Sequence, residues 1–513
     1  MSTTTAELND ATADLERVPS GLDGLDHILG GGMPTGRTTL VSGTAGSGKT
    51  VLALQFLIEG VRRYDEPGVF VTFEERPKEI RRNARTIGFD ISEWEEQGRF
   101  AFVDASYDPD VEEQVVGSYD FGALMARIEH AARTVGAKRV CLDSIGSVFG
   151  RFADADAVRR ELMRVGNALR NMEVTALMTA ERVHDYGEIA RYGVEEFVCD
   201  NVIVLRNVLD EEARRRTVEV MKMRGVNHLS GEFPFTILPG EGIVVITLAG
   251  TDLTAGSTNE RITSGLAELD EMCSLGMFRD SVTLVSGATG TGKSLLTTEF
   301  IDGGAKNGER SLLISFEESR AQLARNAAGW GRDFEHYEES GLLRVECVYP
   351  EVKALEDHLV WIKRIVEEYD PSRIAIDSLS ALERIAPQRS FREFLIGLTA
   401  FIKHRQIAGM LTATARSLLG GESTTEAHIS TLTDMIVLLR YVEIAGEIRR
   451  GITVLKLRGS MHDKKIHEFT IDSSGMHIGA PFRDVTGILA GNPRQVNSAE
   501  GIAELDQMFG PEI

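Results

Sequence analysis

Two segments of the 513-residue chain carry the glycine pattern that holds nucleotide phosphates. Each has the spacing GxxxxGK[ST] between a β-branched apolar run and an apolar helical pattern, which is the context in which the pattern forms a site. Backbone N–H groups curl around the phosphates, the lysine reaches the β- and γ-phosphates, and the final hydroxyl binds Mg²⁺. We therefore expect ATP and Mg²⁺ at Gly43, Thr44, Gly46, Ser47, Gly48, Lys49 and Thr50, and at Gly287, Thr289, Gly290, Thr291, Gly292, Lys293 and Ser294, with Thr50 and Ser294 as metal ligands.

Carboxylates follow further apolar runs in both halves. Asp143 and Asp377 each end a run and precede a serine, where the second carboxylate of a Mg²⁺-nucleotide site (the Walker B position) belongs. A helix N-cap is the alternative for either aspartate. The pairs Glu74–Glu75 and Glu317–Glu318 end other runs and could polarise the water or hydroxyl that attacks the γ-phosphorus. A solvated acidic pair is the ordinary alternative, but recurrence in both halves favours a catalytic role.

Each half also contains a Lys-x-Arg sequence. Lys222 with Arg224, and Lys456 with Arg458, have the spacing that places two side chains on one face of a strand. Both charges would then project together and could reach the γ-phosphate held by a neighbouring copy. A solvated strand face is the alternative. The recurrence of the pair predicts that copies of the chain assemble, as a hexamer, with shared nucleotide sites.

These motifs recur because the chain repeats itself. Residues 39–43 return as 283–287, and residues 222–225 return in similar form as 456–459. Within each half, strand patterns such as 38–41 alternate with helical patterns such as 50–58, which implies an α/β fold with a mostly parallel sheet. Later strands, including 201–205 and 217–221, are expected to be partly antiparallel. We expect a flexible N-terminus at 1–15, P-loop domains at 16–249 and 262–490, a linker at 250–261 and a C-terminal tail at 491–513.

Composition excludes several classes of protein. The chain has 56 Lys and Arg against 78 Asp and Glu, a net charge of -22. Nucleic-acid binding is therefore not expected, because it needs a basic footprint. No run approaches the ~18 apolar residues of a membrane span, and the first residues lack the basic and apolar regions of an export signal. A cytoplasmic protein without a membrane partner is expected, and its four scattered cysteines predict buried or half-buried thiols rather than disulfides or a zinc site.

The two halves differ at one position of chemical interest. Glu196 and Phe197 of the first half align with Ser430 and Thr431 of the second. A hydroxyl group can accept a phosphoryl group, whereas the side chains of the first half would not serve. The difference suggests that the first half hydrolyses ATP and that the second also phosphorylates the chain itself. On spacing alone, however, a Ser–Thr pair before a strand is ordinary.

Taken together, these residues resemble the KaiC family of clock ATPases and autokinases. The resemblance rests on the two P-loop halves, the two Phe-Glu-Glu segments and residues 377–382 and 428–434, and it covers about residues 15–485. It implies two RecA-like domains, a double-ring homohexamer with ATP between subunits, and both autokinase and autophosphatase activity. It maps catalytic glutamates to Glu74, Glu75, Glu317 and Glu318, phosphoacceptors to Ser430 and Thr431, a regulatory threonine to Thr425, and residues reaching ATP across the interface to Lys222, Arg224, Lys456 and Arg458.

The resemblance also bears on partners. Residues 104–124 resemble the first-ring surface on which a small KaiB-like protein docks. Met461 stands where cyanobacterial members have tryptophan, so adenine stacking must be weaker or different there. The tail after about residue 491 differs from the segment that binds the activator KaiA, which puts control by a KaiA-like protein in doubt. A circadian rhythm and an hourglass timer fit equally. A regulatory ATPase without phosphorylation, or less favourably a DNA-acting RecA-like motor, remain alternatives.

Overall fold

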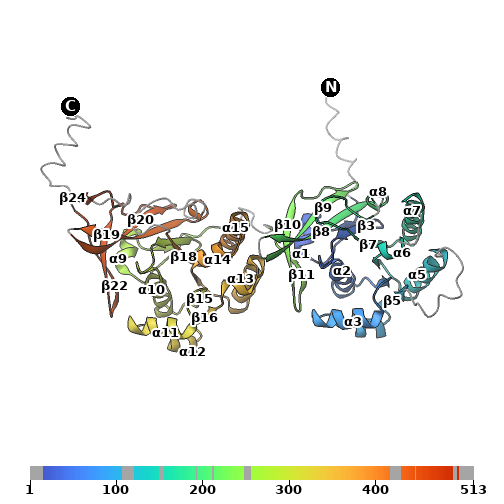
Figure 1. Cartoon of the computed structure of the whole chain (residues 1–513). Coiled ribbons are helices and arrows are strands. Elements are labelled where there is room, and N and C mark those ends of the chain that lie inside the picture. The colour runs from blue at the N-terminus through green and yellow to red at the C-terminus, as the bar shows by residue number, and fades with distance from the viewer. Residues whose placement is uncertain are drawn as a thin grey trace, which may run out of the picture. The chain divides into compact units, whose positions relative to one another are not determined.

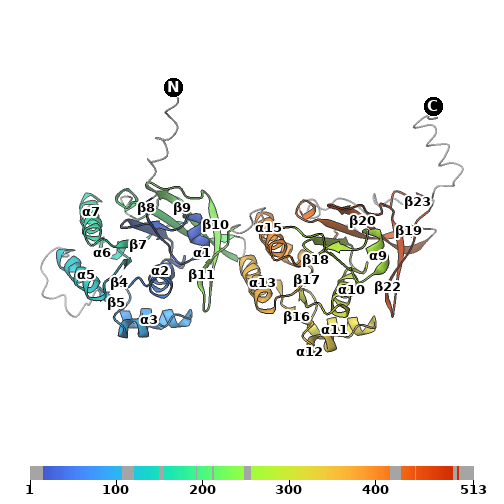
Figure 2. The same cartoon turned by 180° about the vertical axis from the view of Figure 1, so that it is seen from behind.

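The computed structural model describes residues 15–106, 121–149, 155–191, 193, 195–210, 213–247, 256–415, 429–444, 446–483, 485–488 and 494–495. The chain divides into two compact units, Met1–Ala249 and Gly250–Ile513. Figure 1 and Figure 2 show the elements of each unit from opposite sides. Among the described residues, no helix combines the length and the apolar character that crossing a membrane requires.

In the described part of the first unit, nine strands form one sheet in the order β11-β10-β9-β8-β3-β7-β6-β4-β5. Six strands run parallel, and β9, β10 and β11 continue the sheet in antiparallel fashion. The strands are β3 (Thr38–Gly43), β4 (Gly68–Thr72), β5 (Phe100–Asp104), β6 (Arg139–Asp143), β7 (Thr175–Glu181), β8 (Asn201–Asp210), β9 (Ala213–Met223), β10 (Glu232–Leu238) and β11 (Gly242–Val245). The helices are α1 (Asp23–Ile28), α2 (Lys49–Tyr64), α3 (Pro77–Thr86), α4 (Ser92–Glu96), α5 (Phe121–Val135), α6 (Gly146–Phe149), α7 (Ala155–Asn171) and α8 (Glu195–Val198).

The described part of the second unit repeats this order strand for strand, as β22-β21-β20-β19-β14-β18-β17-β15-β16. Its strands are β14 (Val282–Gly287), β15 (Ser311–Ser315), β16 (Leu343–Cys347), β17 (Arg373–Asp377), β18 (Ala408–Thr414), β19 (Met435–Ile444), β20 (Glu447–Leu457), β21 (His467–Asp472) and β22 (Gly475–Pro481). Its helices are α9 (Ala267–Met272), α10 (Lys293–Lys306), α11 (Arg320–Gly329), α12 (Phe334–Glu339), the 3₁₀ helix η2 (Pro350–Val352), α13 (Leu355–Tyr369), α14 (Leu379–Arg384) and α15 (Gln388–His404). The predicted α/β fold with a mostly parallel sheet is confirmed in both units.

Three two-stranded sheets accompany the large ones in the described parts of the chain. β1 (Arg17–Val18) pairs with β2 (Met33–Pro34), and β12 (Arg261–Ile262) pairs with β13 (Met277–Phe278), so both units open in the same way. β23 (Val485–Thr486) pairs with β24 (Arg494–Gln495) near the end of the chain. The four cysteines are all free thiols. Three of them are buried, but Cys347 is exposed, because it ends the edge strand β16, and the predicted burial was wrong for this residue.

Each sheet buries both faces, and consecutive strand residues separate them. In the first unit, Val41 and Phe70 pack with the side chains of α2, whereas Leu40 and Val69 pack with those of α5 and α7. This alternation is the period-two pattern of a strand. Since both faces are covered, the parallel strands read as continuous apolar runs. The motif residues stand at the ends of these buried strands, which fixes the backbone that carries them.

Candidate nucleotide and phosphoacceptor sites

The two GxxxxGK[ST] segments form matching loops between a central strand and a buried helix. The loops join β3 to α2 and β14 to α10, and each helix begins at its lysine. Gly48 and Gly292 precede the helices with φ of 96° and 109°, a left-handed conformation that side chains other than glycine rarely adopt. The predicted strand–loop–helix context is therefore present in both units, and the helix N-terminus faces the loop.

The P-loop lysines lie folded into their own loops. Lys49 Nζ donates to Thr44 O at 3.0 Å, and Lys293 Nζ donates to Gly287 O at 2.9 Å and Ala288 O at 3.0 Å. Burial lowers the pKa of Lys49, while the negative charges of Glu181, Asp143 and Glu74 act against that shift. Burial likewise lowers the pKa of Lys293, opposed by Asp377 and Glu317. Each ammonium is thus buried against the carbonyl oxygens of its own loop, with carboxylates nearby, at the loop where a phosphate is expected to bind.

Each loop hydroxyl meets its predicted aspartate. In the second unit, Ser294 Oγ donates to Asp377 Oδ2 at 2.6 Å, and the Thr412 hydroxyl donates to the other carboxylate oxygen. In the first unit, the hydroxyls of Thr179 and Thr50 bond to Asp143 in the same way. Burial raises the pKa of Asp143, and these two hydrogen bonds lower it. A hydroxyl oxygen beside a carboxylate is the oxygen donor set that suits Mg²⁺, so the residues fit the ion predicted here.

The glutamate pairs are held by equivalent partners in the two units. Ser144 Oγ donates to Glu74 Oε1 at 3.0 Å, and Ser378 Oγ donates to Glu317 Oε2 at 3.2 Å. Both serines directly follow the site aspartates. Arg384 adds an ion pair to Glu317 at 2.9 Å in the second unit. The first glutamate of each pair is therefore hydrogen-bonded to the residue that follows the aspartate of the same unit.

The second glutamate of each pair has a raised pKa. Asn83 Nδ2 donates to Glu75 at 3.0 Å, and Asn326 Nδ2 donates to Glu318 at 3.3 Å. Burial and the nearby Asp143 charge raise the pKa of Glu75, and burial and the Asp377 charge raise that of Glu318. A carboxylate whose pKa is shifted toward neutrality is suited to accept a proton.

Several residues of these sites were not found from the sequence. The threonines Thr179 and Thr412 reach the aspartates from β7 and β18, strands whose place beside β6 and β17 the sequence does not reveal. Glu181 ends β7 opposite Gly43, the first residue of the P-loop, and its carboxylate attracts Lys49. In the second unit Thr414 takes this position opposite Gly287. Glu181 therefore gives the first unit an additional carboxylate, and aligning the two halves on Thr179 and Thr412 was the signal that could have revealed it.

The Lys-x-Arg pairs hold the segments that distinguish the two halves. Lys456 Nζ donates to Ser430 O at 2.5 Å and Thr433 O at 2.6 Å, and the Arg458 guanidinium donates to Thr431 O at 2.8 Å. Lys222 Nζ makes the equivalent contacts in the first unit, to Glu196 O at 2.9 Å and Cys199 O at 2.8 Å. The structure thus superimposes the Ser430–Thr431 segment on Glu196–Phe197. Thr425, Ser423 and Thr424 lie outside the described residues.

The Ser430–Thr431 segment lies near the amino-terminal end of the central strand β14, whereas the P-loop of the same unit lies at the carboxyl-terminal end of that strand. Asp434 accepts a hydrogen bond from Val282 N, the first residue of β14, at 3.0 Å, whereas the P-loop follows the last residue of that strand. A strand of this length spans about 16 Å at roughly 3.3 Å per residue. Arg458 lies at the same amino-terminal end of β14, 3.8 Å from the Asp434 carboxylate. Neither the Ser430–Thr431 segment nor this cation is therefore placed beside the phosphates that the P-loop of the same unit would bind.

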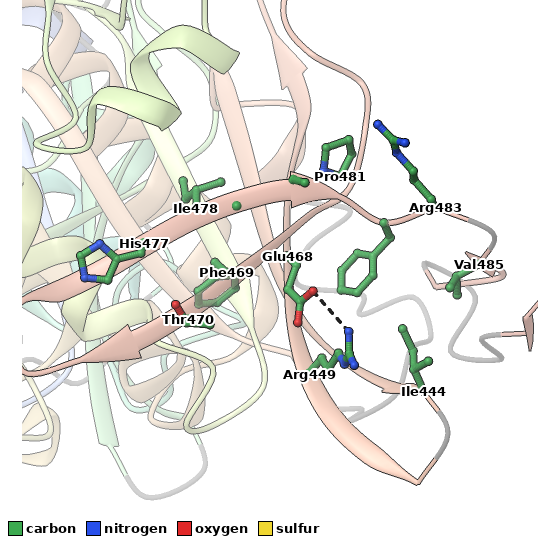
Figure 3. A pocket seen from close by; sticks show the side chains of 13 residues that line it. Ile444, Arg449, Glu468, Phe469, Thr470, His477, Ile478, Pro481, Arg483 and Val485 are labelled. Atoms are coloured by element: carbon green, nitrogen blue, oxygen red, sulfur yellow. Dashed lines mark ion pairs between the residues drawn. The ribbon is translucent and has the colours of Figure 1, made fainter.

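A separate cavity of about 750 Å³ opens beside β21 and β22 in the second unit. Figure 3 shows the Glu468 carboxylate and the Arg449 guanidinium, both of which line it, pointing toward one another; their ion pair measures 3.5 Å. Ile444, Ile478 and Val485 supply apolar walls. None of the predicted site residues lines this cavity, so it is distinct from the nucleotide site.

Comparison with known proteins agrees with the geometry. A sequence model described as the KaiC ATPase matches residues 18–250 and 262–482. The circadian clock protein KaiC3 of Synechocystis sp. is 57% identical over 506 residues, covering 99% of this chain and 100% of that protein. The circadian clock oscillator proteins KaiC of Picosynechococcus sp. and of Thermostichus vulcanus are both 50% identical, over 97% and 96% of this chain and 96% and 94% of their own lengths. This chain, with two tandem RecA-like P-loop domains that bind nucleotide, belongs to the KaiC family of ATPases.

Proposed function

We propose that this chain is a Mg²⁺-dependent ATPase and serine/threonine autokinase of a clock or timer system. In this proposal the first unit hydrolyses ATP, and the second also phosphorylates Ser430 or Thr431 and removes the phosphate again. The names of the relatives, circadian clock proteins, support the clock setting. The observation that carries the autokinase is the Ser430–Thr431 segment, held by Lys456 and Arg458 in the place that Glu196–Phe197 takes in the first unit.

The position of this segment favours transfer between copies. The segment and Arg458 lie across the sheet from their own P-loop. A hydroxyl must come within about 3–3.5 Å of the γ-phosphorus to react, which the span of β14 does not allow inside one unit. We propose that each nucleotide lies between two copies and is contacted by the neighbour's Lys-x-Arg pair. Lys222 and Arg224 would do this in the first unit, Lys456 and Arg458 in the second, within a homohexamer.

Proton removal is assigned to the glutamates. Glu318, with its raised pKa and its Asn326 hydrogen bond, would accept the proton of the attacking hydroxyl, and Glu317 would orient it. Glu75 and Glu74 would act in the same way on water in the first unit. Thr50 with Asp143, and Ser294 with Asp377, would hold Mg²⁺, which supplies positive charge to the transferring phosphate. Lys49 and Lys293 would contact the β- and γ-phosphates.

The proposal extends to partners and place in the cell. A small KaiB-like protein would dock on the first unit at residues 104–124, of which 104–106 and 121–124 belong to the described part of the chain. A KaiA-like activator is not part of the proposal, because the tail after residue 491 differs from the segment such activators bind. We propose a cytoplasmic protein, for which a circadian rhythm and an hourglass timer are equally compatible.

Mixing two inactive variants tests the proposal. Lys293→Ala chains keep the acceptors but lose the second P-loop lysine, and chains with Ser430→Ala and Thr431→Ala keep the P-loop but lose the acceptors. Neither alone should gain phosphate on residues 430–431 with Mg-ATP. After subunit exchange, we expect phosphate on the Lys293→Ala chains, detected by intact mass and peptide mapping.

Three outcomes would count against parts of the proposal. Absence of phosphate on the wild-type chain, with ATP still consumed, would contradict the autokinase and favour a regulatory ATPase. Phosphate on the wild-type chain but not in the mixture would contradict transfer between copies. A wild-type chain that stays monomeric by light scattering with a bound ATP analogue would contradict the hexamer.

A further inference from the structure

A histidine in the second unit connects a surface segment to the buried sheet. His358 of α13 has no exposed surface. Its Nε2–H donates to the carbonyl oxygen of Pro350, the first residue of η2, at 2.9 Å. Its Nδ1 has no hydrogen-bond partner among the described residues. A buried acceptor without a hydrogen-bond partner has a free-energy cost, so burying this imidazole is unfavourable unless its other contacts offset that cost.

The same imidazole contacts the residue that precedes the catalytic glutamates. Its ring meets Phe316 edge to face, with centroids 5.3 Å apart and planes at 90°. Phe316 is 2% exposed, and its backbone N–H donates to Asp377 O at 2.9 Å. Glu317–Glu318 follow it directly in the chain. One side chain therefore contacts both η2 and the side chain of the residue next to the glutamates.

The first unit has a leucine at the position that corresponds to His358. α5 and α13 have the same length, 15 residues, and their fourth residues are Leu124 and His358. Leu124 is buried like His358, and Phe73 is buried like Phe316. A leucine fills the space but cannot hydrogen-bond to a neighbouring loop. The connection is therefore a property of the unit that carries the acceptor segment.

The segment that His358 contacts, residues 349–352, exposes two large apolar side chains. Tyr349 and Val352, on either side of the bonded Pro350 carbonyl, are 73% and 68% exposed. Two large exposed apolar side chains on so short a stretch do not hold it against the protein by themselves. The hydrogen bond to His358 and the burial of Pro350 attach its middle, while Val348 N donates to Ser315 O at 3.1 Å and the Lys353 ammonium lies 4.8 Å from the Trp361 ring centroid on either side of it.

We propose that His358 is a positioning residue for phosphoryl transfer in the second unit. It fixes Phe316, and through it Glu317–Glu318, against the segment 349–352. The inference rests on the proposed function of those glutamates. Because His358 touches neither nucleotide nor acceptor, its loss should lower the rate constant of transfer and leave the affinity for ATP unchanged.

The test compares two substitutions with opposite effects on the hydrogen bond. His358→Leu copies the first unit and removes the bond, whereas His358→Gln keeps an N–H donor of similar reach. We expect His358→Leu to lower the single-turnover rate of phosphorylation at residues 430–431 five- to tenfold, with KM for ATP within twofold. His358→Gln should keep at least half of the wild-type rate. Phe316→Leu, which removes the ring contact and leaves the histidine in place, should resemble His358→Leu.

Several results would overturn the inference. These are a wild-type rate for His358→Leu in folded protein, equal losses for Leu and Gln, or a change confined to KM. If His358→Leu does not fold, Phe316→Leu with a wild-type rate would overturn it equally. If the wild-type chain transfers no phosphate, the proposed function fails on its own, and the rate to compare is second-unit hydrolysis, taken as the ATPase activity lost on Lys293→Ala. An unchanged second-unit hydrolysis in His358→Leu would then overturn the inference.

Discussion

At the scale of single residues, burial and hydrogen bonds act in opposite directions on the pKa of the site carboxylate Asp143. Asp143 is buried, which raises its pKa, and the hydroxyls of Thr179 and Thr50 lower it. A carboxylate must be ionised to hold a cation, so these hydroxyls support both the charge and the geometry of the proposed Mg²⁺ site. The sequence predicted Asp143 and Thr50 from their motifs. It could not predict Thr179, because that contact depends on β7 lying beside β6.

Thr179→Val should move the acid limb of first-unit ATP hydrolysis to higher pH. The substitution removes a bond to the ionised carboxylate, so the pKa of Asp143 rises further and the aspartate is protonated at a higher pH. A hydrogen bond to a charged group contributes about 1.5 kcal/mol or more, which corresponds to a shift of about one pH unit. The pH dependence of ATPase activity in the Lys293→Ala background measures this shift. Thr179→Ser, which keeps the hydroxyl, is the control, and an unmoved acid limb for Thr179→Val would contradict the assignment.

Asn326→Ala should affect phosphoryl transfer in the same direction through Glu318. Burial and Asp377 already raise the pKa of Glu318, and the Asn326 amide lowers it. Without the amide the pKa rises further, so the glutamate is protonated, and unable to accept a proton, at a higher pH. We expect the acid limb of phosphorylation to move up by roughly half a unit, since the group is only partly buried. Asn83→Ala should leave phosphorylation unaltered and shift first-unit hydrolysis instead; a shift toward lower pH in Asn326→Ala would disprove the role.

At the scale of elements, the opening of each unit depends on close backbone approach. Gly265 has a φ of 91°, and a Cβ there would lie 1.8 Å from Glu299 O of α10. Asp270 stabilises this opening by accepting hydrogen bonds from Ser264 N at 2.7 Å and from Thr263. A glycine is therefore required here because any side chain would collide with α10, and this gives the recurrence of the Ser-Gly-Leu segment a steric cause. The helix it contacts is the one that begins at the P-loop lysine.

Gly265→Ala should destabilise the second unit far more than Gly308→Ala. Both glycines have positive φ, but a Cβ at Gly308 would meet nothing within 4 Å. The control therefore pays only the conformational cost, about 1 kcal/mol, while Gly265→Ala must also displace the α10 backbone and should lose roughly 3 kcal/mol or more. Thermal or denaturant unfolding of the two variants measures the difference. Equal losses of stability in the two variants would show that the α10 backbone can move away from the new side chain at no cost in free energy.

The order of the strands could not be predicted from the sequence, although individual strands and a helix next to the motifs could. Buried runs such as 38–41 and 201–205 lie in β3 and β8 as expected, because parallel strands covered on both faces are continuously apolar. Which strand lies beside which depends on long-range packing. For this reason only the folded units show that Glu181 lies opposite Gly43. They also show that Ser430–Thr431 lies at the end of β14 away from the P-loop.

At the scale of the whole molecule, duplication has produced two sites with the same frame and different surroundings. Both units keep the loop lysine, the hydroxyl–aspartate contact and the glutamate pair. They differ at Glu181 against Thr414, at Leu124 against His358, and at Glu196–Phe197 against Ser430–Thr431. The shared frame binds nucleotide, so the differences are where separate activities must arise.

The two lysines should therefore separate the two activities. Lys293→Ala removes the ammonium that lies in the second loop, so phosphate on residues 430–431 should fall at least a hundredfold while first-unit ATP hydrolysis persists. Lys49→Ala removes the first-loop ammonium and should abolish most of the remaining hydrolysis, because that lysine stabilises the transferring phosphate. Measuring ADP release and bound phosphate on the same samples distinguishes the two effects. If Lys293→Ala still phosphorylates itself without wild-type chains present, the kinase belongs to the first unit, and the acceptor segment would have to be served by the nucleotide held at Lys49.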